Sequence, residues 1–161
     1  MAAVDYFLKI AEIPGESTDS KHKNEIDVKE WHWEQTNSGS HAGGGGGGAG
    51  KVVMEDIHFH INTDKSSPKL FLACATGQHI KEAILTCRKA GKQQQEFLKI
   101  KLNDLLVSKY HTGGTPEDVL PKDHFTLNFT KIEITYAAQK ADGTLDSPVV
   151  HHYDRKGQSG A

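Results

Sequence analysis

Apolar and polar residues alternate with a period of two along much of the chain, which is the pattern of β-strands. Residues 4–10 and 53–62 show it most clearly, and a Pro-Gly turn signal follows the first segment. The apolar face of the second segment comprises Val53, Ile57, Phe59 and Ile61, and its polar face comprises Asp56, His58, His60 and Asn62. A strand with one dry face and one wet face is typical of antiparallel sheet.

A strand is also predicted for Ile26 to Trp33, but its apolar positions change face midway. Ile26 and Val28 share one face, whereas Trp31 and Trp33 share the other. A β-bulge or a twisted barrel edge would account for the change. The two indoles could stack on a sugar or a base, although such tryptophans more often pack in a core or between subunits.

Residues 36–50 are predicted to form a long flexible loop, since they include six consecutive glycines. The stretch Gly45 to Lys51 looks like a phosphate-binding loop, which requires glycines, a lysine and then Ser or Thr at the start of a helix. Val52 occupies the Ser/Thr position, and strand-like alternation follows it. We therefore expect no nucleotide binding there.

One short helix is predicted at 68–76. Ser67 can cap its N-terminus, Pro68 suits the first helical position, and Gly77 suits the position after its end. Its apolar stripe would comprise Leu70, Phe71 and Cys74. The next segment, Ile80 to Lys89, matches helical and strand spacing equally well, so periodicity leaves it open.

Further strands are predicted towards the C-terminus. Residues 96–102 and 105–111 read as two strands, and 125–136 as a long one whose apolar positions change phase near Thr130 and Lys131. A bulge at that point would produce the change. A last strand is expected at 149–153, after an Asp-Gly turn and before a polar tail over about 154–161. Many strands with one small helix indicate a β-barrel or sandwich.

Composition narrows the class of protein. The 161 residues suit a single domain, 1–161, and the net charge of −2 favours neither a polyelectrolyte nor a nucleic-acid binder. Cys74 and Cys87 lack metal or disulfide spacing, so we expect two free, buried thiols. No stretch approaches the about 18 apolar residues of a membrane span, and the N-terminus lacks the features of a signal peptide.

The ten histidines are the candidate chemistry. His58 and His60 project from one strand face, and His151 and His152 lie near the other end of the chain; such pairs can bind zinc or copper. No carboxylate or thiol stands at ligand spacing, and no nucleophile motif is present. We expect no metal, cofactor or catalytic residue. A metal-dependent barrel enzyme and a monomeric ligand-binding barrel remain the alternatives.

Several stretches, taken in order, resemble the Hcp family, the haemolysin-coregulated tube proteins of type VI secretion. They are Ile13-Pro14-Gly15-Glu16-Ser17, Glu25-Ile26-Asp27-Val28 with Trp31 and Trp33, Gly48-Ala49-Gly50-Lys51, Ser67-Pro68-Lys69-Leu70, Ala73-Cys74-Ala75-Thr76-Gly77, Cys87-Arg88-Lys89-Ala90-Gly91, Leu106-Val107-Ser108, Leu127-Asn128-Phe129 and Gln139-Lys140-Ala141-Asp142-Gly143. The resemblance extends from Val4 to about Tyr153 in register. One departure is His32, where the family commonly has a small residue between the tryptophans.

The resemblance implies a β-barrel of two antiparallel sheets with one short helix, and it assigns 80–89 as a strand. It also implies a homohexameric ring, stacked rings, small secreted effectors in the lumen, and contacts with the sheath and the valine-glycine-repeat spike protein. The protein would lie in the bacterial cytoplasm before firing and outside the cell afterwards. No nucleic-acid or membrane partner is expected.

Two sets of site residues follow from this implication. His32, on the face opposite the two tryptophans, is expected to contact the lumen and its effectors. The glycine loop is expected to contact the next ring through Ser38, Gly39, Ser40, His41, Gly45, Gly48 and Lys51.

Overall fold

The computed structural model describes residues 3–39 and 51–161. The strands are β1 (Val4–Ile10), β2 (Ile26–Val28), β3 (Glu30–His32), β4 (Gln35–Asn37), β5 (Val52–Met54), β6 (Ile57–Asn62), β7 (Ile80–Lys89), β8 (Glu96–Gly113), β9 (Lys122–Tyr136), β10 (Val149–Asp154) and β11 (Ser159–Gly160), and the helix is α1 (Ser67–Thr76). The predicted class is confirmed: the chain is mainly β, with two antiparallel sheets and one short helix.

The larger sheet closes on itself into a barrel because one strand of the wall is split. β2 pairs with β1, whereas β3 pairs with β6, and the backbone N–H of Lys29 between them donates to the carbonyl of His60 at 2.8 Å. The circuit then continues through β9, β8 and β7 back to β1. The change of face predicted within 26–33 is therefore the point where the chain passes from one neighbouring strand to the other.

Aromatic and branched side chains fill the barrel. Phe59 and Phe125 are 0% exposed, and their rings stack with centroids 5.4 Å apart. Trp31 pairs with Phe59 across β3 and β6, packs against this core, and meets the ring of Tyr6 edge-on at 6.3 Å. Because these side chains are buried against one another, the interior of the barrel is a packed core. Burying one such Phe contributes about 1.5–3 kcal/mol.

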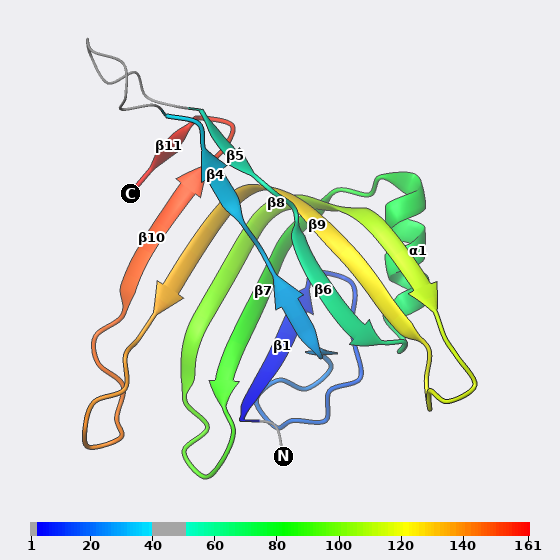
Figure 1. Cartoon of the computed structure of the whole chain (residues 1–161), viewed down its shortest axis with the longest axis horizontal. Coiled ribbons are helices and arrows are strands. Elements are labelled where there is room, and N and C mark those ends of the chain that lie inside the picture. Colours follow the sequence, from blue (N-terminus) through cyan, green and yellow to red (C-terminus); the bar gives the residue numbers. More distant parts are fainter. Residues whose placement is uncertain (1–2, 40–50) are drawn as a thin grey trace.

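A smaller assembly of strands extends from one end of the barrel (Figure 1). β9 is long enough to pair along one edge with two strands: residues 122–127 pair with β6, and residues 131–136 pair with β10. The short β11 pairs with β10, so the predicted polar tail folds back into the sheet. β4 and β5 form the second sheet, close to β10 and β11 in the figure.

The predicted division of 96–111 into two strands is wrong, since β8 runs unbroken. The predicted bulge at Thr130 and Lys131 is also wrong: the β8–β9 register is the same on both sides of this point, and the register shift in this pair lies between Val107 and Lys109. In both β8 and β9 the buried positions move to the other face of the strand at the same level. At this level Asp104 of β8 adopts a φ of 50°, between the pairs Leu102–Ile132 and Leu105–Phe129. The predicted phase change of the apolar residues in β9 therefore exists, but no extra residue is inserted in β9 to produce it.

The predicted helix is confirmed, with two corrections. Ser66 is the N-cap, whereas Ser67 is the first helical residue, and Gly77 takes the left-handed conformation (φ 64°) expected at the C-terminal cap. Leu70 and Ala73 carry the buried face, while Phe71 is 58% exposed. Phe71 therefore does not belong to the apolar stripe that packs on the barrel.

Candidate functional site

Histidines gather on the outer surface of the wall formed by β3, β6, β9 and β8. Because side chains alternate along a strand, the residues between the buried aromatics point outwards. The strand register places His32 beside His58, and His60 beside His124. We call these four residues the imidazole cluster.

The four rings of the imidazole cluster contact one another in a closed circuit. The centroid distances are 4.3 Å from His32 to His58, 5.1 Å from His58 to His124, and 4.3 Å from His124 to His60. His60 and His32 complete the circuit at 6.1 Å. His58 Nδ1 and His124 Nε2 lie 2.8 Å apart, which requires that one nitrogen donates and the other accepts.

This packing disfavours protonation of the two central rings. Burial, together with His60, Lys109 and the other rings, lowers the pKa of His124 to about 4. Burial, His32 and Lys109 likewise lower the pKa of His58 below its ordinary value. Both rings are therefore neutral near pH 7, and the surface they form is aromatic and uncharged.

The surroundings of the cluster contain few fixed charges. On β8, Lys109 lies opposite Thr126 and His111 lies opposite His124. On β3, the exposed Glu30 pairs with His60. The carboxylate of Asp56 accepts hydrogen bonds from Ser108 Oγ at 2.6 Å and from Asn128 Nδ2 at 2.7 Å.

The arrangement does not suit a metal ion. Within residues 3–39 and 51–161, no group of three or more His, Cys, Asp or Glu side chains is placed to hold one. The stacked rings present their faces to one another, whereas ligands must direct their nitrogens to a common point. His151 and His152 lie on β10, which pairs with the opposite half of β9.

Trp31 and Trp33 are half-buried, and His32 between them is exposed, as strand alternation predicts. Trp33 donates its Nε1–H to the carbonyl of Glu55 at 2.7 Å and packs 6.2 Å from the ring of Phe129. Both indoles thus belong to the barrel and its junction with β4 and β5. The interpretation of the tryptophans as packing residues is supported.

The two ends of the glycine loop meet at the β4–β5 sheet. The backbone N–H of Ser38 donates to the carbonyl of Lys51 at 3.3 Å, and Gly39 N–H donates to Asn37 Oδ1 at 2.8 Å. Lys51 is exposed. Ser40, His41, Gly45 and Gly48 lie outside the described residues.

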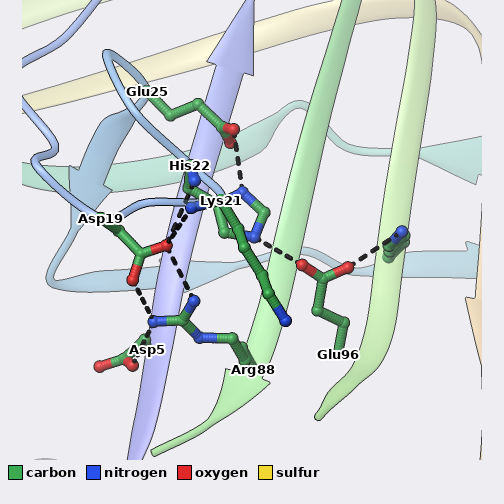
Figure 2. A network of polar contacts seen from close by, with 8 residues as sticks. Asp5, Asp19, Lys21, His22, Glu25, Arg88 and Glu96 are labelled. Atoms are coloured by element: carbon green, nitrogen blue, oxygen red, sulfur yellow. Dashed lines mark hydrogen bonds and ion pairs between the residues drawn. The ribbon is translucent and has the colours of Figure 1, made fainter. Parts of the chain in front are cut away.

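The opposite side of the barrel is covered by a loop that a polar network holds in place (Figure 2). The guanidinium of Arg88 on β7 is 2% exposed and bonds both carboxylate oxygens of Asp19, at 2.7 and 3.0 Å, and Asp5 at 3.2 Å. It also lies 4.8 Å from the centre of the Phe7 ring. Its hydrogen bond to Asp19 is the largest influence holding the pKa of that carboxyl well below its usual range.

His22 continues this network. Its ring stacks on Phe7 at 4.4 Å and bonds Glu25 at 2.9 Å and Glu96 at 2.6 Å. Burial raises the pKa of Glu96, but the bonds from His22 and Lys99 outweigh it and bring the pKa below its usual value. Each group is used within the fold, so the network anchors the loop of residues 11–25 to β1 and β7.

Sequence reasoning found His32, His58 and His60 but missed His124 and Lys109. His124 does stand at a polar position of an alternating strand, opposite in phase to Phe125 and Phe129. That signal shows a wet face, yet only the pairing of β9 with β6 brings His124 to the other histidines.

Comparisons with known proteins agree over nearly the whole chain. Residues 7–136 match the family described as "Type VI secretion system effector, Hcp". The chain is 48% identical over 151 residues to Protein hcp1 of Pseudomonas aeruginosa, with 93% of each covered. The described chain contains no helix of the length and apolarity that a membrane crossing requires.

Solved structures share the fold. Hcp1 from Salmonella typhimurium is 33% identical with a TM-score of 0.82, covering 99% of this chain and 100% of that one. A type VI secretion system effector from Yersinia pestis is 31% identical with a TM-score of 0.77, covering 93% and 99%. At 24% identity, the structure of a type six secretion system protein reaches a TM-score of 0.93 and supports the fold alone.

Proposed function

This chain belongs to the Hcp family of type VI secretion proteins, and from that premise we propose that it is the secreted subunit of the inner tube. Six copies would close into a ring, and rings would stack into a tube. The observation that carries the proposal is the family match, which covers residues 7–136 and is joined by 48% identity to an Hcp1 protein. The protein would work by assembly, without a cofactor and without catalysis.

The packed interior of the barrel favours a role in assembly and disfavours the binding of a small ligand inside the barrel. A monomeric ligand-binding barrel needs an internal cavity with a few polar groups. Phe59, Phe125 and Leu127 are instead 0% exposed in a continuous apolar core. The surfaces that remain for partners are on the outside of the wall.

We assign the wall of β3, β6, β9 and β8 to the lumen. Its outer surface is wet and includes His32, while the outer surface of β1 and β7 is covered by residues 11–25 and the Arg88 network. A lumen wall must stay accessible to passengers, and the uncovered side meets that need. Small secreted effectors would lie against it.

The glycine loop would contact the next ring through Ser38, Gly39, Ser40, His41, Gly45, Gly48 and Lys51. Its two ends leave the β4–β5 sheet at the extension of the barrel. Since the tube must come apart after delivery, these contacts would be weaker than those within a ring. The sheath and the valine-glycine-repeat spike protein would be the further partners, and residues 1–161 would act as one domain.

Sedimentation velocity and negative-stain imaging of the purified protein test the assembly. The expected result is a hexameric ring with a central hole, and a monomer at tens of micromolar, on the order of concentrations where obligate assemblies persist, would contradict it. Shortening residues 40–50 is a second test. Hexamers should remain while stacking and secretion fall; loss of the hexamer would refute the role in stacking.

A further inference from the structure

The imidazole cluster is the feature that the packing of one chain does not explain. His32 is exposed, and His58, His60 and His124 are half-exposed. None of the four belongs to the apolar core, and within the described part of the chain the hydrogen bond among the four rings joins His58 to His124. Their other ring nitrogens therefore remain available to a partner.

Mild acid changes the charge of this surface in one direction. The titratable and charged groups that face it are Glu30 and His32 on β3, Asp56 just before β6, His58 and His60 on β6, Lys109 and His111 on β8, and His124 on β9. Protonation of an imidazole adds a positive charge beside a lysine that is already charged. His124, whose pKa is about 4, gains its charge last. Glu30 and Asp56, which is hydrogen-bonded to Ser108 and Asn128, are the two acids among these groups, against six basic side chains. Protonation therefore leaves the surface with an excess of positive charge.

Anionic groups from outside would supply the missing counter-charge. Rings in contact at 4.3 Å repel one another when both are protonated, and a carboxylate bound at their edges would relieve the repulsion. Binding of carboxylates and uptake of protons would then favour each other, because linkage between two binding events is reciprocal. Flat imidazole faces also offer stacking to the side chains that accompany the carboxylates.

We propose that the imidazole cluster of His32, His58, His60 and His124 is a binding surface for acidic segments of a passenger protein, and that it binds them more tightly in mild acid. This inference rests on the proposed function only where it identifies the ligand as a passenger protein. The surface itself can be tested with one chain or with a ring. Retention would strengthen as the solution is acidified from neutral pH, and it would weaken with salt, since the attraction is between charges.

Fluorescence anisotropy with a labelled oligoglutamate peptide measures the binding. The protein should bind the peptide about tenfold more tightly at about pH 5 than at about pH 7.5, at fixed ionic strength. His32→Gln with His60→Gln should remove most of that gain. The matched control is His79→Gln with His151→Gln, which removes two exposed histidines elsewhere and should leave the gain within about twofold.

Three outcomes would overturn the proposal: equal affinity at both pH values, equal loss in the matched control, or oligothymidylate binding as tightly as oligoglutamate. The last would indicate a surface for any polyanion. If the double variant misfolds, His32→Gln alone, at an exposed position, should still reduce the gain. Sedimentation velocity in the same buffers keeps the two proposals separate, because peptide binding without rings would refute the tube and leave the surface standing.

Discussion

Arg88 offers the sharpest test of how the barrel is held together. The prediction concerns Arg88→Ala, which removes a guanidinium bonded to both oxygens of Asp19 and to Asp5. The variant should fold less stably, because the half-buried carboxylate of Asp19 then loses its cation.

The structure allows the size of the effect to be worked out. Breaking a buried ion pair from one side costs about 3–5 kcal/mol. Asp19 would keep hydrogen bonds from the backbone N–H groups of Lys21 and His22, and its side chain is 19% exposed, which indicates the lower end, about 3 kcal/mol. At about 2–4 °C per kcal/mol for a chain of this size, the melting temperature should fall by about 6–12 °C.

Thermal melts followed by circular dichroism measure this, with Lys101→Ala as the matched control. Lys101 is also a strand cation with an acidic partner, Glu82, but the two side chains are 43% and 37% exposed and 3.7 Å apart. An exposed pair of this kind contributes about 0–1 kcal/mol, so the control should melt close to the wild type.

The pH dependence provides a second check on the same pair. Because the pKa of Asp19 is lowered in the fold, mainly by its hydrogen bond from Arg88, its contribution is present above the unfolded pKa of about 3.9 and is lost as the pH falls below that. The difference between wild type and variant should therefore be constant near neutral pH and shrink below about pH 4. If Arg88→Ala melts within about 2 °C of the wild type at pH 7, or if Lys101→Ala costs as much, the reasoning is refuted.

Two further predictions concern other parts of the barrel. Trp31→Ala should lower the melting temperature or prevent ring formation, whereas His32→Ser should leave both unchanged and alter which effector co-purifies; the reverse result would show that the faces of β3 are misassigned. Burial raises the pKa of the Cys87 thiol to about 12, so a thiol reagent should modify the half-buried Cys74 alone in the native protein and both thiols in urea. Native modification of Cys87 would show that β7 opens.

The local elements could be predicted from the sequence because each has a periodic signature. Alternation placed β1 and β10 correctly, and the Ser-Pro start with Gly77 at the end gave α1 within one residue. The predicted strand 53–62 was correct only over β6, because residues 52–54 form β5 in the other sheet and Val53 is 49% exposed. The same alternation assigned Trp31 and His32 to opposite faces. Such signals depend on neighbours a few residues apart, so the chain carries them without its partners.

Which strands pair, and where a strand changes neighbour, could not be predicted in this way. The change of face between Val28 and Trp31 looked like a bulge, and only the closed barrel shows that the strand passes from β1 to β6. The phase change near Thr130 likewise depends on the strand beside it, since Asp104 on β8 turns at the same level. Periodicity gives a face, but register belongs to two strands at once.

The candidate sites divide in the same way. The sequence by itself determined that His32, His58 and His60 stand at polar positions of strands, because alternation fixes which side each occupies. Only the tertiary structure brought His124 to them, since it lies 66 residues from His58 in the sequence. The tertiary structure likewise placed Arg88 beside Asp19, which is 69 residues away in the sequence. These groupings require closure of long stretches of chain, and the packing of the whole barrel decides them, so no local pattern records them.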